Sequence, residues 1–390
     1  MLGNLLHRGH WPIALDLGSD SIKMLQMQPG SGGLAVRACA RWRLPVTAPR
    51  EGEAWRQLVS GAVREMFRKG AFRGNRVISA LSCDQLKIKN IRVPHQPDGD
   101  WDEIVHGEAS ERFGYRFAPG ELFYLQAGSV RQGQDTYQEV ILLGAPSEVV
   151  EDHYALLVDM GLTPVHIDAE PLAMFRPFER RLRRSADENC ISVVVDIGHT
   201  AAKVIVARGR NLLLIKRIGI GGRDLADAVA KQLSLPYEEA VDLRMQMLRD
   251  QARLQDDAKA DSDPAARDPI SVNWMIVDAI RGQVEELARE IALCLRYCSV
   301  TFRGLRAREV TLTGGQAYDA EMVKMLGEQL GVPCEVGRPL KGIDLSAVDL
   351  GSDRRTMLAE WGVCTGLALR ARECERTTRK RDHEGHRLSA

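Results

Sequence analysis

The sequence predicts an α/β protein of two lobes that are related by an internal duplication, with a small α+β subdomain inserted into the first lobe. Two observations lead to this prediction. The strand–turn–strand pattern WPIALDLGSDSIKMLQM at Trp11–Met27 returns as SVVVDIGHTAAKVIVA at Ser192–Ala207. Between the copies, residues 85–165 follow a β-α-β-β-α pattern, which is long enough for a small subdomain.

The composition is that of a soluble globular protein. The chain has 390 residues, 44% hydrophobic and 27% charged. Its 53 basic and 53 acidic side chains balance, so we expect no nucleic-acid partner. No apolar run approaches the roughly 20 residues of a membrane span, so we expect a cytoplasmic protein. The eight cysteines include no CxxC pair, which favours reduced, buried thiols over a metal site.

The two copies are alike in detail. In each, a short apolar strand ends in Asp-x-Gly, and a lysine follows at the same offset where the next strand begins. This pattern is typical of a β-hairpin with a tight polar turn. The matched residues are Asp16, Gly18 and Lys23 in the first copy and Asp196, Gly198 and Lys203 in the second.

Such turns are suited to binding phosphate. A glycine-containing turn presents several backbone N–H groups in one concave nest. A carboxylate beside the nest repels phosphate unless a cation bridges them, and Mg²⁺ is often held by one or two carboxylates plus phosphate. Two facing loops would therefore clamp a Mg²⁺–polyphosphate, with Asp16 and Asp196 at the metal. The remaining candidate loop residues are Ser19, Ser21, His199 and Thr200.

The lysines allow two interpretations. Lys23 and Lys203 either reach the phosphates or lie solvated on a strand face. A single Asp-x-Gly turn also has a plain structural interpretation, as the closure of a hairpin. The repetition at matched offsets is what favours a binding function.

Two further elements complete a candidate nucleotide site. A strand at Val310–Thr313 runs into Gly314, Gly315 and Gln316 and then a helix, which is suited to receive a phosphate or to pack against a base. Glu170 precedes Pro171 at a strand-to-helix junction. It either complements the helix dipole or orients a water for attack on the γ-phosphate, and it is our candidate catalytic residue.

A glycine-rich turn into another helix is the fifth element. Gly221 and Gly222 precede this helix, and Glu239 and Arg244 lie on the helix that follows it. Glu239 and Arg244 either project toward a ribose or base, or form surface salt bridges.

These elements define the expected organisation of the chain. The predicted boundaries are 11–84 for the first lobe, 85–165 for the insert, 166–190 for a connecting helix that closes the first lobe, 191–222 for the core of the second lobe, 223–305 for a helical subdomain with a charged linker at 251–269, 306–370 for the remaining core with its closing helix, and 371–390 for a disordered tail.

Taken in order, the elements resemble the superfamily of actin, heat-shock chaperone ATPases and sugar kinases. ALDLGSDSIK is similar to its first phosphate motif, VVDIGHTAAK to its second, DAEPLAMF to its first connecting helix, LTGGQA to its adenosine motif and EWGVCTGLALR to its closing helix. The resemblance runs from Trp11 to Arg370 and implies an actin-like ATPase fold that binds ATP with Mg²⁺.

Within that superfamily, the chain resembles the type IV pilus assembly protein PilM family, which is similar to the division protein FtsA. VISALSCDQLKIKNIRVP at the start of the insert and GIGGRDLADAVAKQLSLPYEEAV carry this likeness. It implies an adaptor at the inner face of the inner membrane that binds a short N-terminal cytoplasmic peptide of PilN, a bitopic membrane protein. By resemblance, Asp16 and Asp196 associate with Mg²⁺, the loops line the phosphates, and Gly222, Gly314 and Gly315 face the nucleoside.

Three other functions remain open on the sequence alone. An FtsA-like filament former would self-associate and needs an amphipathic C-terminal helix, which 371–390 does not offer. A sugar kinase needs a catalytic carboxylate over a sugar pocket. A nucleotide-free relative would not need two intact Asp-x-Gly loops.

Overall fold

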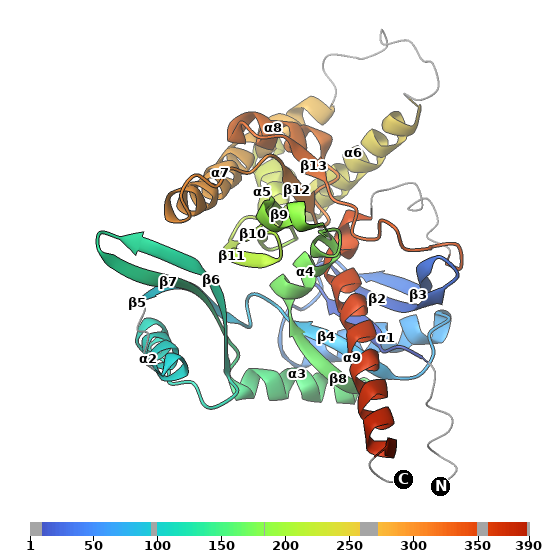
Figure 1. The fold of residues 1–390 in the computed structure, drawn as a ribbon. Coiled ribbons are helices and arrows are strands. Elements are labelled where there is room, and N and C mark those ends of the chain that lie inside the picture. The colour runs from blue at the N-terminus through green and yellow to red at the C-terminus, as the bar shows by residue number, and fades with distance from the viewer. Residues whose placement is uncertain (1–9, 95–99, 183, 258–271, 349–357, 388–390) are drawn as a thin grey trace.

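Two five-stranded sheets with surrounding helices form two lobes, and a three-stranded sheet forms the insert (Figure 1). The structure is a computed structural model that describes residues 10–94, 100–182, 184–257, 272–348 and 358–387. Among these residues, no helix combines the length and the apolar character that crossing a membrane requires.

The first lobe is built on a sheet of strand order β3-β2-β1-β4-β8. Its buried apolar side chains pack against α1 (Gly52–Lys69) and α3 (Ser147–Asp159), which brings Ile13, Val63 and Leu157 into one core. The strands are β1 (Ile13–Leu17), β2 (Ser21–Gly30), β3 (Gly33–Arg43), β4 (Arg76–Leu81) and β8 (Thr163–Ala169).

The second lobe repeats this topology, which confirms the internal duplication. Its sheet has the order β11-β10-β9-β12-β13, and in both sheets two antiparallel pairs are followed by two parallel pairs. The strands are β9 (Ile191–Ile197), β10 (Ala202–Arg208), β11 (Asn211–Ile218), β12 (Val310–Thr313) and β13 (Cys334–Val336). The helices are α5 (Gly222–Leu233), α6 (Tyr237–Asp257), α7 (Val272–Thr301) and α8 (Ala320–Leu330).

The insert is smaller than predicted. Its elements are β5 (Lys87–Pro94), α2 (Trp101–Phe113), β6 (Leu122–Gln132) and β7 (Asp135–Gly144), with their own core around Val93 and Val105. The predicted boundary at residue 165 is wrong, because α3 and β8 belong to the first lobe. Leu156 and Leu157 of α3 are buried in that lobe's core, and β8 pairs with β4 in parallel.

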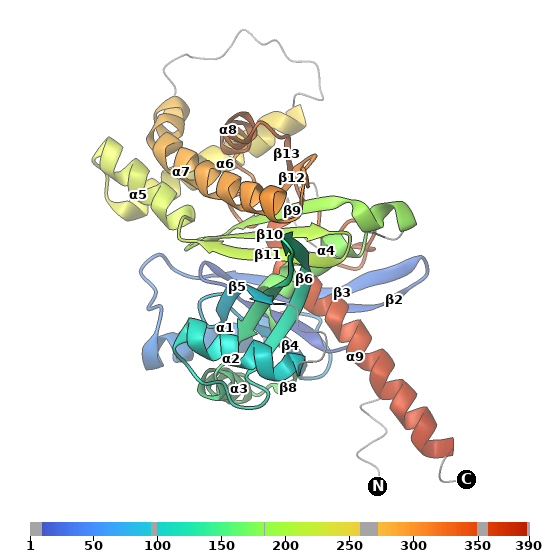
Figure 2. The ribbon, with the colours of Figure 1, turned by 60° about the vertical axis from the view of Figure 1, so that its left-hand side comes forward.

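The insert also contacts the second lobe, which the sequence did not predict. The Asn90 side chain donates to the carbonyl of Leu213 at 3.0 Å, and the Asn211 side chain donates to the carbonyl of Ala127 at 2.9 Å. The sheet of the insert therefore lies against β11, as Figures 1 and 2 both show. The insert, which interrupts the chain of the first lobe, is thus in contact with both lobes.

Two helices cross where the lobes meet, α4 (Glu170–Glu179) and α9 (Gly362–Arg387). Their backbones nearly touch, because a Cβ atom at Gly366 would lie only 1.7 Å from the carbonyl oxygen of Ala173. Arg176 reinforces the crossing. Its guanidinium donates to the carbonyl of Gly366 at 2.9 Å and pairs with Asp168 at 2.8 Å.

The predicted tail and linker differ from what the structure shows. α9 continues to Arg387, so the prediction of disorder from residue 371 is wrong up to that point; residues 388–390 lie outside the described residues. The physical reason is that good helix formers follow Gly366 without Gly or Pro until Gly385. Of the predicted linker, 251–257 is helical within α6, and 258–269 lies outside the described residues. Figure 2 shows the end of α9 extending beyond the lobes.

The helix crossing gives a stability prediction. Gly366→Ala forces α4 and α9 apart, so we expect it to lower the free energy of unfolding by about 1–3 kcal/mol, as overpacking does. Gly282→Ala in α7 is the matched control, because a Cβ there has nothing within 4 Å and alanine favours helix. Urea denaturation measures both. A Gly366→Ala protein as stable as the control would contradict the close crossing.

Candidate functional site

A cleft of about 1100 Å³ lies between the lobes, and both hairpin turns line it. The turns face each other, since the hydroxyl oxygens of Ser19 and Thr200 are 3.5 Å apart. The predicted site residues that the cleft brings together are Asp16, Gly18, Ser19, Ser21, Lys23, Glu170, Asp196, Gly198, His199, Thr200, Lys203, Gly314, Gly315 and Gln316.

Each hairpin pairs its own aspartate with its own lysine. Asp16 stands opposite Lys23 in the β1–β2 register, and Asp196 stands opposite Lys203 in the β9–β10 register. The ammonium-to-carboxylate distances are 3.3 Å and 2.7 Å. The lysines are therefore not solvated on a strand face, because their side chains are only 9% and 14% exposed.

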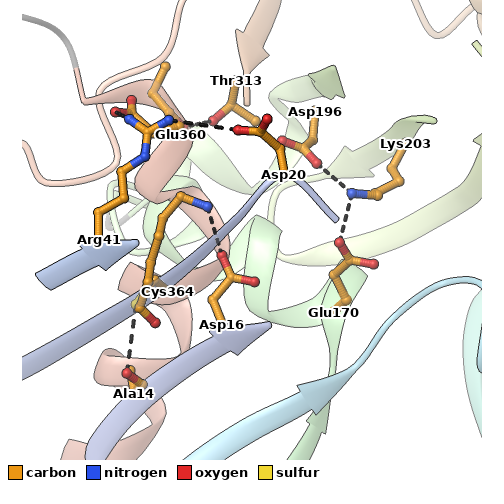
Figure 3. A network of polar contacts seen from close by, with 12 residues as sticks. Ala14, Asp16, Asp20, Arg41, Glu170, Asp196, Lys203, Thr313, Glu360 and Cys364 are labelled. Carbon is orange, nitrogen blue, oxygen red and sulfur yellow. Dashed lines mark hydrogen bonds and ion pairs between the residues drawn. The ribbon is translucent and has the colours of Figure 1, made fainter. Parts of the chain in front are cut away.

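Glu170 joins this arrangement at the first residue of α4 (Figure 3). Its Oε1 lies 2.7 Å from Nζ of Lys203, so one ammonium bridges Glu170 and Asp196. Its Oε2 accepts the backbone N–H of Cys83 at 2.8 Å. Both oxygens of the candidate catalytic carboxylate are thus engaged within the protein.

The charges of this cluster fix its protonation states. Burial by itself would lower the pKa of Lys203, but the attraction of Asp196 and Glu170 outweighs it and holds that pKa well above the usual value. Burial would raise the pKa of Glu170, yet the attraction of Lys203 keeps it below the usual value. Burial raises the pKa of Asp16 in spite of Lys23. At neutral pH, Lys203 is therefore protonated and Glu170 ionised.

His199 adds no positive charge to the second loop at neutral pH. Burial lowers the pKa of its imidazole, and the nearby charges of Asp20 and Arg50 act on it in opposite directions. A neutral imidazole offers one N–H donor and one acceptor to a ligand.

Backbone contacts hold the second loop in shape. The N–H groups of Gly222 and Arg223, at the start of α5, donate to the carbonyls of Gly198 and His199 at 2.9 Å and 2.8 Å. Gly314 adopts φ +89° against Asp196, where a Cβ would lie 2.5 Å from Oδ1. Only glycine fits there, and the close approach joins the Gly-Gly turn to the loop.

Four predicted residues do not line the cleft: Gly221, Gly222, Glu239 and Arg244. Gly222 instead lies beneath Gln316, whose amide nitrogen would be 2.4 Å from an added Cβ. Arg244 is buried behind it, where it pairs with Asp319 at 3.6 Å and donates to the carbonyl of Gly222. Glu239 is exposed on α6.

Several cleft residues escaped the sequence analysis. They are Asp20, Arg41, Arg50, Arg217, Arg223, Tyr237 and Glu360. Glu360, just before α9, pairs with Arg41 of β3 at 3.1 Å and accepts the hydroxyl of Tyr318. Arg41 and Glu360 are 319 positions apart, so no local pattern could link them (Figure 3).

A Mg²⁺ ion in this cleft would need phosphate oxygens to complete its coordination. Among the residues that the structure describes, no three His, Cys, Asp or Glu side chains gather as a ready metal cage. Asp16 and Asp196 nevertheless line one cleft, beside turns with hydroxyl groups. This set fits an ion that keeps most of its waters and is held largely through phosphate.

Two duplicated lobes around a cleft of paired phosphate-type loops define the chain as a protein of the actin-like ATPase fold. Its sequence matches the family described as type IV pilus assembly protein PilM over residues 14–250. The chain therefore belongs to the PilM family, as the sequence predicted.

Solved structures agree with this fold. A PilM-PilN type IV pilus biogenesis complex is similar with a TM-score of 0.69 and 24% identity over 92% of this chain and 98% of that one. The ethanolamine utilization protein EutJ from Carboxydothermus hydrogenoformans gives 0.52 and 16%, over 93% and 90% of the chains. MreB 5 of Spiroplasma citri bound to AMPPNP gives 0.51 and 11%, over 97% and 99%.

Proposed function

We propose that this chain is an ATP-binding adaptor of type IV pilus assembly, or of a related secretion system. It acts at the cytoplasmic face of the inner membrane and binds a PilN-like membrane protein. The observation that carries the proposal is the pair of Asp–Lys loops that face each other across one cleft. Membership of the PilM family supports the same function.

The charges of the cleft suit a nucleotide that arrives with a cation. Asp16, Asp196 and Glu170 bring three carboxylates to the phosphate end, against the two ammonium groups of Lys23 and Lys203. A phosphate that lies against these carboxylates is repelled unless a cation lies between them. Mg²⁺ would supply that cation, and the hydroxyl groups of Ser19 and Thr200 at the facing turns can donate to the phosphates. A related fold in the MreB 5 structure holds AMPPNP, which supports a nucleotide here.

ATP binding should depend on the second loop. We predict that Asp196→Ala weakens Mg²⁺–ATP binding at least tenfold, about 1.4 kcal/mol, because the ion loses a carboxylate and Lys203 loses one of its two partners. Isothermal titration calorimetry measures it. Asp278→Ala on α7, whose side chain does not line the cleft, is the control, and this variant should bind ATP as the wild type does. Equal affinities in the two variants would overturn the two-loop site.

Turnover should be slow. Glu170 is the carboxylate placed to orient a water, yet Lys203 and the Cys83 N–H engage its two oxygens. An anchored carboxylate is a weak activator of water. We predict that Glu170→Gln lowers the rate of phosphate release about tenfold or more, while ATP affinity changes less. Single-turnover phosphate release, with calorimetry beside it, separates the effects. Hydrolysis at the wild-type rate would remove Glu170 from the mechanism.

The partner peptide needs an apolar surface. Phe123 on β6, Tyr154 and Val158 on α3, and Val165 on β8 are 56%, 50%, 46% and 36% exposed. Phe123 lies where the insert meets the first lobe, since Glu121 beside it accepts the N–H of Ser147 at the start of α3. Tyr154 and Val158 continue this exposed apolar set along α3, and Val165 continues it on β8. β8 is also an edge strand, whose free side can pair with an extended segment.

We propose that this junction binds a short N-terminal cytoplasmic segment of a PilN-like protein. The similarity to a PilM-PilN complex supports the choice of partner. A segment that orders on binding loses conformational entropy, so its affinity depends on apolar anchors that the junction buries.

The junction can be tested directly. The double variant Tyr154→Ser, Val158→Ser should weaken binding of a synthetic PilN-like N-terminal peptide about tenfold, through the loss of buried apolar area. Leu293→Ser with Val300→Ser on α7 is the matched control, since both are exposed there. Fluorescence anisotropy of the labelled peptide measures both. If the α7 variant binds the peptide more weakly and the α3 variant binds it as the wild type does, the docking surface lies on the second lobe.

A further inference from the structure

Glu170 connects three parts of the chain that are distant in sequence. It begins α4 in the first lobe and pairs with Lys203 in the second lobe. It also accepts the N–H of Cys83, just after β4, where the chain leaves the first lobe for the insert. One carboxylate thus contacts the second phosphate-type loop and the root of the insert together.

The root of the insert is a compact turn. Gln85 donates its N–H to the carbonyl of Ser82 at 3.0 Å, and its side chain accepts the N–H of Ser82 at 2.9 Å. Cys83 occupies the second position of this turn, and its N–H is directed to Glu170 instead. Asp84 of the same turn pairs with Arg217 of β11 at 2.6 Å, so, among the described residues, Glu170 is one of two groups from outside the turn that hold it. β5 begins two residues after the turn.

Lys203 can take a third partner. An ammonium carries three N–H donors, and Asp196 and Glu170 accept two of them. The third remains for a phosphate oxygen in the cleft, which Lys203 lines. The first loop lacks this link, since Lys23 bonds only the carboxylate of Asp16 among the described side chains. The two loops therefore differ in their contacts. Through Lys203 and Glu170, the second loop is connected to the turn at which the insert begins, and Lys23 of the first loop makes no such contact among the described side chains.

We infer that Lys203, Glu170 and the Cys83 N–H form a relay that transmits nucleotide binding to the insert. The inference rests on the proposed function, and it adds the route of regulation. A phosphate that engages Lys203 fixes the ammonium, the ammonium fixes Glu170, and Glu170 orders the Ser82–Gln85 turn. ATP thereby prepares the insert for its partner. By linkage, a partner that orders the insert raises the affinity for ATP by the same factor.

Hydrogen–deuterium exchange of the full chain tests the relay with Mg²⁺–ATP as the probe. In the wild type, saturating ATP should slow exchange at both loops and, about threefold or more, at residues 84–94. Cys83→Pro removes the amide donor at a turn position that favours proline and leaves the side chains of the cleft unchanged. In this variant, ATP should still slow exchange at the loops but leave 84–94 unchanged. Glu179→Gln, at the far end of α4, is the control and should behave as the wild type.

The outcomes separate the relay from the proposed function. If ATP protects neither the loops nor residues 84–94 of the wild type, ATP binding itself is refuted. If ATP protects the loops but not 84–94, the function stands and the relay is overturned. Full protection of 84–94 in Cys83→Pro, whose cleft side chains are intact, also overturns the relay.

Discussion

The pairing of a carboxylate with an ammonium across each hairpin is the interaction on which this site depends. Asp196 and Glu170 would repel each other at the cleft if Lys203 did not stand between them at 2.7 Å from both. Removing one member would leave a largely buried charge uncompensated, which is costly. The strand register enforces the pairing, since Lys203 lies directly opposite Asp196. The strand register therefore sets the position of both charges at this end of the cleft.

Two close backbone approaches hold together elements that surround the cleft. Gly314 lets the Gly-Gly turn lie against Asp196, and Gly366 lets α9 cross α4 at the carbonyl of Ala173. Any side chain at either glycine would separate the elements that it joins. Both contacts connect parts of the chain that carry the site, so packing precision here is a condition of function as well as of stability.

The insert contacts both lobes close to the cleft. It leaves the first lobe beside Glu170, and it rests on the second lobe through Asn90 and Asn211. Tyr297 of α7 also donates to the buried carboxylate of Glu139 on β7 at 2.8 Å. A change in how the lobes sit must therefore alter either the insert or these contacts, because packed elements do not deform continuously.

The sequence by itself determined the duplicated hairpins, the order of elements and most of the cleft residues, because strand alternation and the Asp-x-Gly turns are local patterns. It left the partners of Lys23 and Lys203 open, it extended the insert to residue 165, and it ended the closing helix too early. Only the tertiary structure decided that Glu170 binds Lys203 and Cys83, that Arg41 meets Glu360, and that Arg244 lies buried behind Gly222. These contacts join residues that are distant along the chain, and their geometry follows from how the two sheets, α4 and α9 pack around the cleft.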